Sequence, residues 1–189
     1  MQTNVRCNWC EKDDLYRHYH DTEWGKPSHD DHHLFEHLIL ETFQAGLSWH
    51  TILAKRENFR IAFDNFNAET IAIYNEEKVS ELLQNAGIIR SLGKINAVIS
   101  NARFYLECVK EFGTFDNYIW QFTHYKIIEN NWFSMKELPA TSPESDAMSK
   151  DLKMRGFKYI GSTTCYAYMQ SVGMVNDHLQ SCFLYNKSV

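Results

Sequence analysis

Residues 142–173, SPESDAMSKDLKMRGFKYIGSTTCYAYMQSVG, contain the strongest structural signal in the chain. Ser142 followed by Pro143 is an N-cap with proline at the first helical position, which predicts that a helix begins there. Gly156 ends this helix, and Ser162 begins another. The segment therefore has the form of a helix-hairpin-helix element.

The turn between these two helices, RGFKYIGS, has two interpretations. Gly156 and Gly161 permit positive φ and close backbone approach, and the N–H groups at the start of the second helix can hold a phosphate. Lys158 adds positive charge, so the element would bind DNA. In the alternative interpretation two helices simply turn, and the basic residues complement a helix dipole at a solvated end. These basic residues are Lys150, Lys153, Arg155 and Lys158. The glycine spacing alone does not separate the two.

Helical patterns dominate the rest of the chain. Apolar residues recur at helical spacing, glycines mark helix ends, and Asp, Asn, Ser or Thr mark helix starts. Strand patterns are scarce, and residues 124–139 are expected to be irregular. We therefore expect an all-α protein in which residues 1–189 form a single compact unit. The further helices are predicted at about 13–20, 31–45, 49–59, from 67, 75–86, 91–112 and 114–122.

Composition places the chain among ordinary globular proteins. Its 189 residues, 44% of them hydrophobic, can bury a substantial core. No apolar run approaches the length of a membrane span, and the N-terminus does not resemble a signal peptide, so we expect a soluble cytoplasmic protein without a membrane partner. Five cysteines, an odd number, argue against a disulfide framework. The net charge of −5 argues mildly against non-specific nucleic-acid binding, so a basic face would be local.

Cysteines and histidines near the two ends of the chain suit one metal ion. His178 and Cys182 are four residues apart, so on a helix both would point from the same face. With Cys7 and His20 they form a closed set of two sulfurs and two nitrogens, which is typical of structural zinc. Such a site would tie the termini together. From spacing alone, Cys10 can replace Cys7, and chance can also produce this spacing among nine histidines and five cysteines.

The N-terminal part of the chain is rich in tryptophan and tyrosine. These side chains combine a flat apolar face with a polar group and suit stacking on a planar ligand, although most aromatic residues at helical spacing, such as Phe35 and Phe43, belong to the core. Glu41 lies at the border of an apolar helix face, where a carboxylate needs a partner or a role. A glutamate that reaches solvent is the alternative. The aromatic candidates are Trp9, Tyr16, Tyr19, Trp24 and Trp49.

Seven segments, in unchanged order between Cys7 and Cys182, resemble the DNA-3-methyladenine glycosylase I family. They are LYRHYHDTEWG, LETFQAGLSW, KRENFR, NAGIIR, KINAVISNAR, SDAMSKDLKMRGFKYIG and VNDH. The resemblance covers almost the whole chain. It implies an all-α helix-hairpin-helix glycosylase that cleaves the N-glycosidic bond of 3-methyladenine in alkylated double-stranded DNA and leaves an abasic site for base excision repair.

The resemblance implies a role for each matching position. The ligands of one structural zinc ion would be Cys7, His20, His178 and Cys182. Glu41 would read the damaged base, and the pocket aromatics would be Tyr16, Tyr19, Trp24 and Trp49, with Trp9 near the pocket mouth. The loop that fills the gap in the duplex would contain Gly46 and Leu47, and the hairpin contacts to DNA would come from Gly156, Lys158, Gly161 and Ser162. No obligate protein partner is expected.

Four points qualify this picture. The family commonly has Asp-Pro where this chain has Asp13-Asp14, and a proline often stands where this chain has Ser162; both differences concern local rigidity and phosphate contact. Related enzymes that also cleave the strand use a lysine shortly after the hairpin glycine to form a Schiff base. Here serine and threonines follow Gly161, so we expect base excision without strand cleavage. Asp177 is a candidate general base, or alternatively a cap of the helix that bears the metal ligands.

The expected chemistry begins with extrusion of the base from the stack. A 3-methylated adenine is cationic while it is attached to the sugar, so its glycosidic bond is already weak and aromatic faces attract it. Glu41 would accept a hydrogen bond from the exocyclic amine and offset the charge. Two alternatives remain: a non-enzymatic module that senses damaged or bent DNA, which would need the hairpin but not Glu41 with its aromatic pocket, and a glycosylase of the same fold with another alkylated base as its main substrate.

Overall fold

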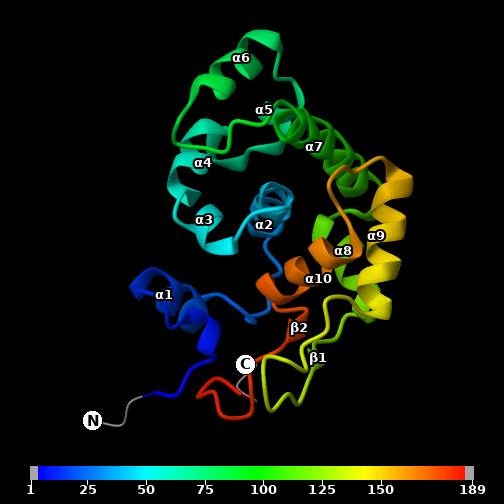
Figure 1. Ribbon diagram of the computed structural model, residues 1–189. Coiled ribbons are helices and arrows are strands. Elements are labelled where there is room, and N and C mark those ends of the chain that lie inside the picture. Colours follow the sequence, from blue (N-terminus) through cyan, green and yellow to red (C-terminus); the bar gives the residue numbers. More distant parts are fainter. Residues whose placement is uncertain (1–3, 186–189) are drawn as a thin grey trace.

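Helix α2, Asp31–Gln44, lies at the centre of the computed structural model, which describes residues 4–185 (Figure 1). Every side chain from Leu34 to Phe43 is buried, including those of Glu36, His37 and Glu41. A helix that is buried on all sides must be surrounded by other elements. Those in contact with it include α3 (Trp49–Leu53), α7 (Leu92–Phe112), α8 (Phe115–Trp120) and α10 (Ser162–Ser171).

Five helices begin where the sequence predicts. Side-chain caps at Asp13, Asn67, Asn75, Thr114 and Ser142 each accept a hydrogen bond from the backbone N–H three residues later. The caps begin α1 (Asp14–Thr22), α5 (Ala68–Ala72), α6 (Glu76–Gln84), α8 and α9 (Pro143–Arg155). Helix α4 (Arg56–Ala62) has no side-chain cap, and short 3-10 helices lie at Asn8–Cys10, Asp64–Phe66 and Gln121–Thr123.

The structure corrects the expected helix at about 49–59, which is two helices. α3 ends at Leu53 and α4 begins at Arg56. Lys55 stands at the break, and its Nζ donates to the carbonyls of Ala86 and Gly87 at 3.2 Å. The change of direction allows Phe59 of α4 to be buried, with its ring centroid 4.6 Å from that of Phe43. These contacts join residues far apart in the chain, so helical periodicity cannot indicate them.

The fold is mostly helical, as expected, with one short pair of strands among residues 4–185 that the all-α expectation did not include. β1 (Ile128–Glu129) pairs in parallel with β2 (Val175–Asn176), with Ile128 opposite Val175. A strand of two residues has no periodicity, so the segment 124–139 shows no strand pattern. The residues after β2 form turns, not the helix expected for His178 and Cys182. Asp177 therefore caps no helix there.

Helices α9 and α10 form a hairpin whose turn is held from outside. Asn101 of α7 accepts from the backbone N–H of Lys158 at 2.8 Å and donates to its carbonyl at 3.2 Å. Gly156 has φ +105°, and a Cβ there would lie 2.3 Å from the ring of Phe104, so only glycine fits. Gly161 differs: its φ is −78° and the space beside its Cα is open.

The two ends of the described chain lie side by side (Figure 1). The backbone N–H of Phe183 donates to the carbonyl of Val5 at 2.8 Å, and that of Gln180 donates to the carbonyl of Trp132 at 3.0 Å. A small second core, separate from the main one around α2, includes Cys7, Tyr19, Trp24, Leu53, Leu179 and Cys182. Within residues 4–185, none of the helices combines the length and the apolar character needed to cross a bilayer.

Candidate functional site

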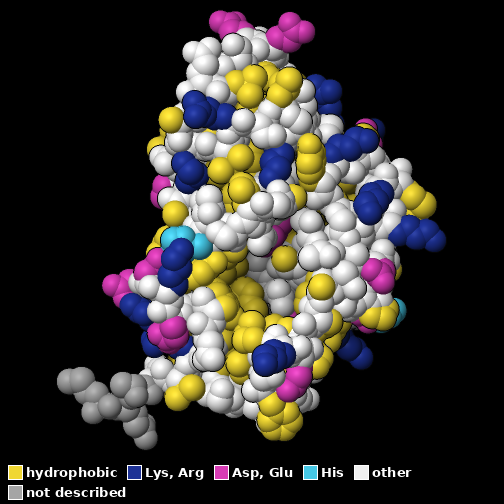
Figure 2. Space-filling view, viewed as in Figure 1, with side chains coloured by type: hydrophobic (Ala, Val, Ile, Leu, Met, Phe, Trp, Pro, Cys, Tyr) yellow, Lys and Arg dark blue, Asp and Glu magenta, His cyan; other side chains and the backbone are white. Residues whose placement is uncertain are grey.

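A cavity of about 190 Å³ opens between α1, α2, α3, α10 and the segment before α9. Figure 2 shows this face of the molecule hollowed, with hydrophobic side chains gathered in the hollow. We call the cavity the aromatic pocket. It is lined by Trp9, Tyr16, Tyr19, Trp24, Glu41, Gln44, Trp49, Met135, Leu138, Ala167 and Gln170. The five aromatic candidates and Glu41, which are up to forty positions apart in the sequence, therefore share one cavity.

Glu41 is the acidic residue of this pocket. Its side chain is 3% exposed, and its Oε2 is buried with no hydrogen-bond partner among residues 4–185. Burial disfavours the charged form and raises the pKa of this carboxyl to about 8. Glu36, one and a half turns earlier on α2, is equally buried but accepts from Arg60 at 3.0 Å. An unpartnered carboxylate in a cavity is a group ready to accept hydrogen bonds from a ligand.

The aromatic wall is built from three local structures. Tyr16 and Tyr19 lie one turn apart on α1, and Asp13 caps this helix. The ring centroid of Trp9 lies 5.2 Å from that of Tyr16, edge to face, and Trp49 lies 5.4 Å from Tyr19. Ser48 caps α3 directly before Trp49. The indole Nε1 atoms of Trp9 and Trp49 are buried without a partner in the described chain, so the wall also offers free N–H donors.

The replacement of proline by Asp14 leaves the start of α1 well supported. Asp13 accepts from the backbone N–H of Tyr16 at 2.9 Å and also contacts Nε2 of His50 at 2.5 Å. Asp14 accepts from Arg17 at 2.7 Å, and an acidic side chain in the first turn favours the helix dipole. The difference from the family pattern therefore changes the way the helix starts without removing its cap.

Asp177 lies outside the pocket lining and is fully buried. Its two oxygens accept four hydrogen bonds: from Asn130 and Trp132 at 2.7 Å, from the hydroxyl of Tyr166 at 2.8 Å and from the amide of Gln170 at 2.6 Å. Such a carboxylate anchors its neighbours. Because Gln170 lines the pocket, Asp177 positions one of the pocket walls.

A second depression of about 360 Å³ adjoins the aromatic pocket and shares Glu41, Gln44 and Ala167 with it. Its other walls are the loop after α2, with Gly46 and Leu47, and the start of α10. Gly46 has φ +79°, and the side chain of Leu47 is 40% exposed. The exposed loop and the hairpin helix therefore border one continuous surface that leads into the pocket.

The hairpin carries fewer free cations than its sequence suggests. Arg155 donates to Glu111 at 2.7 Å and to Asp151 at 2.8 Å, so its charge is compensated. Lys150, Lys153 and Lys158 remain exposed. Ser162, which stands where the family often has proline, contacts the hydroxyl of Ser145 at 2.8 Å and donates to Asp146, so it links the two hairpin helices.

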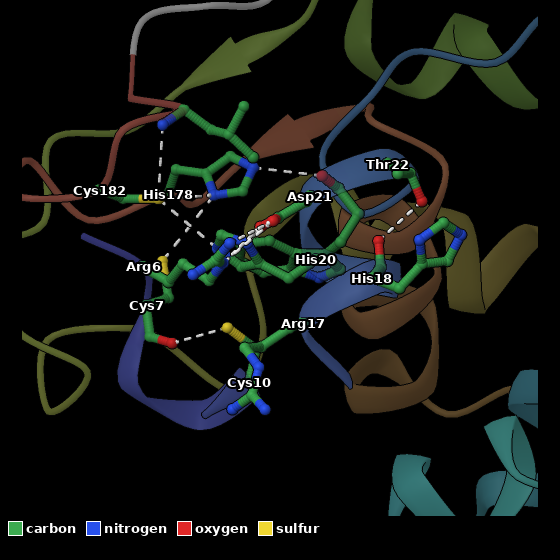
Figure 3. A network of polar contacts seen from close by, with 12 residues as sticks. Arg6, Cys7, Cys10, Arg17, His18, His20, Asp21, Thr22, His178 and Cys182 are labelled. Atoms are coloured by element: carbon green, nitrogen blue, oxygen red, sulfur yellow. Dashed lines mark hydrogen bonds and ion pairs between the residues drawn. The ribbon is translucent and has the colours of Figure 1, made fainter. Parts of the chain in front are cut away.

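Four side chains from the two ends of the chain meet in what we call the Cys/His cluster: Cys7, His20, His178 and Cys182 (Figure 3). All four are buried, and their ligand atoms lie within 4.8 Å of one another. Sγ of Cys182 lies 3.5 Å from Nε2 of His20 and 3.6 Å from Nδ1 of His178, which lies 3.8 Å from Sγ of Cys7. A tetrahedral zinc ion separates its sulfur and nitrogen ligands by about 3.5 Å, so the spacing fits such an ion.

The surroundings of the cluster orient its side chains. Nδ1 of His20 contacts Asp21 at 2.8 Å, and Arg6 holds Asp21 in turn at 2.8 Å. Nε2 of His178 contacts the carbonyl of Trp24 at 3.2 Å, which leaves Nδ1 facing the cluster. Such outer contacts are typical of metal sites. Cys10, the alternative to Cys7, donates its thiol to the carbonyl of Cys7 at 3.1 Å and lies outside the group (Figure 3).

Sequence reasoning missed five lining residues. Gln44 lies three positions after Glu41, so helical spacing could have indicated it. Ala167 and Gln170 are likewise three apart on α10, but only the packing of α10 against α2 brings them to the pocket. Met135 and Leu138 come from a segment without regular structure, where no pattern indicates which side chains face inward.

Comparisons with known proteins identify relatives along nearly the whole chain. A family model described as methyladenine glycosylase matches residues 9–185. The chain is 47% identical over 180 residues to DNA-3-methyladenine glycosylase 1 of Escherichia coli K12, covering 95% of this chain and 96% of the relative. It is 45% identical over 178 residues to DNA-3-methyladenine glycosylase of Haemophilus influenzae, covering 94% and 96%.

Solved structures agree with these relatives. A crystal structure of 3-methyladenine DNA glycosylase I superimposes with a TM-score of 0.93 at 48% identity, covering 96% of this chain and all of that one. A structure of the Staphylococcus aureus 3-methyladenine DNA glycosylase I, which addresses its recognition of 3-methyladenine, gives a TM-score of 0.93 at 31% identity, covering 97% and 98%.

The buried carboxyl of Glu41 predicts how stability depends on pH. Its ordinary pKa of 4.5 applies to the unfolded chain, and its pKa is about 8 in the folded protein. Between these values the folded protein keeps a proton that the unfolded chain has lost, so Glu41 lowers stability progressively as pH rises from 4.5 to 8. Glu41→Gln should remove this effect and raise the free energy of unfolding by on the order of a few kcal/mol at pH 8.

Thermal unfolding of wild type and Glu41→Gln at pH 5 and pH 8 measures this difference, which should be small at pH 5. Glu36→Gln is the matched control, because the Glu36 side chain is as buried as that of Glu41 but forms an ion pair with Arg60. In this pair Oε1 of Glu36 lies 2.7 Å from Nη2 of Arg60. The substitution should destabilise the protein at pH 8, since Arg60 loses its partner. Equal melting temperatures of Glu41→Gln and wild type at pH 8 would contradict the assigned pKa.

Proposed function

Because the chain belongs to the methyladenine glycosylase family, we propose that it is a DNA-3-methyladenine glycosylase that hydrolyses the N-glycosidic bond of 3-methyladenine in DNA. The reaction leaves an abasic site and begins base excision repair. The observation that carries this proposal is the unpartnered, buried carboxyl of Glu41 in a cavity of aromatic side chains. A module that only senses DNA shape has no need of such a pocket.

The pocket and its ligand are chemically complementary. The damaged base is flat, cationic while attached to the sugar, and carries an exocyclic amine. Aromatic faces attract such a cation by about 0.5–2 kcal/mol per good contact, and the carboxylate of Glu41 accepts from the amine. The positive charge of the base also favours the ionised form of Glu41, which burial alone disfavours. Normal adenine lacks that charge, so it gains less from the same pocket.

The bond that breaks needs little acid catalysis, because the base departs as a neutral molecule. The protein must extrude the base, hold it and admit water to the sugar. We assign no proton transfer to Asp177, since all four of its hydrogen bonds are to the protein and it holds Gln170 in the pocket wall. Ser162, Thr163 and Thr164 follow Gly161, so no lysine is offered there for Schiff-base chemistry, and the enzyme excises the base without cutting the strand.

DNA reaches the pocket along the surface between the hairpin and the loop after α2. The helix-hairpin-helix element, α9 and α10, contacts phosphates through the backbone at Gly161 and Ser162 and through the exposed Lys158. The open space beside Gly161 allows the sugar–phosphate backbone to approach closely. The exposed side chain of Leu47 then fills the gap that the extruded nucleotide leaves. The hairpin element spans about residues 142–173 of a single catalytic unit.

We infer that the Cys/His cluster holds one structural zinc ion. Two sulfurs and two nitrogens are the donor set that zinc prefers, and four protein ligands leave no open position for catalysis. The ion would join Cys7 and His20 near the N-terminus to His178 and Cys182 near the C-terminus, beside the α1 side of the pocket. Its contribution is therefore to stability and to the position of α1.

The recognition role of Glu41 predicts a loss of excision in Glu41→Gln. The substitution keeps the size of the side chain, removes its charge and exchanges one acceptor for a donor. The lost hydrogen bond and charge compensation should cost on the order of 1–3 kcal/mol, which slows release of 3-methyladenine roughly ten- to a hundredfold. Single-turnover excision from methylated duplex DNA at saturating enzyme measures this rate.

Tyr74→Phe provides a control, because Tyr74 lines a separate depression, and this variant should leave excision unchanged. Duplex affinity should be the same in all three proteins, since the hairpin supplies the phosphate contacts. Equal excision by Glu41→Gln and wild type would remove Glu41 from the mechanism, and no excision by any of them would favour a binding module.

The zinc assignment predicts about one zinc ion per chain in purified protein. Cys182→Ala should lower both the zinc content and the melting temperature, because metal binding and folding are coupled. Cys10→Ala is the matched control, since its buried thiol lies beside the cluster without belonging to it, and Cys108→Ala is a distant one. Elemental analysis and thermal unfolding provide the data; zinc-free, folded wild type would reject the assignment.

The hairpin proposal predicts that Lys158→Ala weakens binding to all duplexes alike. Loss of one phosphate contact should reduce the slope of log K against log salt by about 0.9. Lys126→Ala is the comparison, because this exposed lysine precedes β1, which lies at the other end of α9 from the hairpin turn (Figure 1). Binding isotherms between low and high salt measure the slopes, and an unchanged slope for Lys158→Ala would exclude a direct phosphate contact.

A further inference from the structure

A second group of side chains has the chemistry to hold a metal ion, and we call it the His/Glu cluster: Glu23, His33 and His37. One ligand atom from each residue lies within 4.8 Å of the other two. His33 and His37 are four apart on α2, so both rings leave the same face of the helix, and their centroids are 4.3 Å apart. Glu23 follows the end of α1.

The imidazole nitrogens of this cluster lack partners. His37 is fully buried, and neither of its ring nitrogens has a hydrogen-bond partner within residues 4–185. Nδ1 of His33 is buried and equally unpartnered. Buried polar atoms are almost always satisfied, and each exception costs about 1–3 kcal/mol. Three such atoms on two neighbouring rings therefore indicate a group that the described chain does not itself supply.

The carboxylate of Glu23 is held in place by Arg56. Arg56 donates to both of its oxygens, at 2.5 and 2.9 Å, and each oxygen keeps a further lone pair. Arg60 is paired with Glu36, so the two arginines and two glutamates balance in charge around the rings. A ligating carboxylate is usually held by a hydrogen-bonded neighbour in this way.

We propose that Glu23, His33 and His37 bind a late first-row divalent metal ion, such as zinc, in a second site separate from the Cys/His cluster. Two imidazoles and a carboxylate are a donor set that such ions accept, and three protein ligands leave a position for water. A tetrahedral ion holds nitrogen and oxygen ligands about 3.3 Å apart, so ligand atoms separated by up to 4.8 Å would have to move together by up to about 1.5 Å.

The His/Glu cluster and the aromatic pocket share helix α2, so a metal ion in the cluster can influence the pocket. His37 lies one turn before Glu41 on the same helix, and its ring centroid is 6.1 Å from that of Trp49 in the pocket wall. A bound cation there would favour the ionised form of the Glu41 carboxyl. The binding site itself does not depend on the proposed glycosylase activity, and metal binding can be measured without DNA.

Equilibrium dialysis with zinc tests the proposal. The sample is full-length protein in which the Cys/His cluster is already loaded with zinc. Wild type should bind one additional zinc ion, and His33→Ala and His37→Met should each bind it at least about 100-fold more weakly, because each loses one of three ligands. His32→Ala is the matched control on the same helix: its Nε2 contacts the carbonyl of Asn65, it is exposed, and it should bind like wild type.

Cobalt substitution identifies which site is filled. Cobalt added as the second equivalent should show no thiolate charge-transfer band, since the His/Glu cluster has no sulfur ligand. His37→Met replaces a buried ring by an apolar side chain, whereas His33→Ala changes a half-buried position. If one variant fails to fold, zinc binding by the other variant still tests the proposal. No second ion in wild type, its retention in both variants, or its loss in His32→Ala would each overturn the proposal.

Discussion

The burial of α2 on all sides is the constraint on which the rest of this structure depends. The helix carries Glu36, His37 and Glu41 into the interior, and the desolvation of each must be offset or tolerated. Glu36 is offset by Arg60, which comes from α4. Glu41 and His37 have no such partner in the described chain. Burial raises the pKa of Glu41 and lowers the pKa of His37, so it favours the neutral form of each group.

The unpartnered buried atoms are concentrated where ligands would bind. Among the side chains of residues 4–185, and apart from the hydroxyl of Tyr168, these atoms belong to Trp9, Glu41 and Trp49 of the aromatic pocket and to the two histidines of the His/Glu cluster. A protein that leaves polar groups unsatisfied around a cavity loses stability there and gains donors and acceptors for a ligand. The pocket is therefore a region of low intrinsic stability held in a well-packed frame.

That frame is assembled from both ends of the chain. α1 supplies one pocket wall, and the Cys/His cluster brings α1 and the segment before it together with the segment after β2. α10 supplies the opposite wall, and Asp177 fixes it by accepting hydrogen bonds from Tyr166 and Gln170. The hairpin turn is held in turn by Asn101 of α7. The proposed DNA surface and the base pocket thus share one rigid helix, α10, which would couple the position of the duplex to that of the extruded base.

The sequence by itself determined the features that depend on neighbours within a turn of the chain. Helix starts at Asp13, Asn75 and Ser142 were predictable because each cap binds a backbone N–H only three residues away. The family motifs also indicated the pocket aromatics and the four Cys/His residues. Only the tertiary structure decided that Cys10 lies outside the cluster, that the chain after β2 turns without forming a helix, and that Asp177 anchors four donors. It also decided which side chains of residues 124–139 line the pocket. These features depend on contacts between residues far apart in the chain. Helical periodicity and capping patterns reflect only residues close together in the sequence, so they do not predict such contacts.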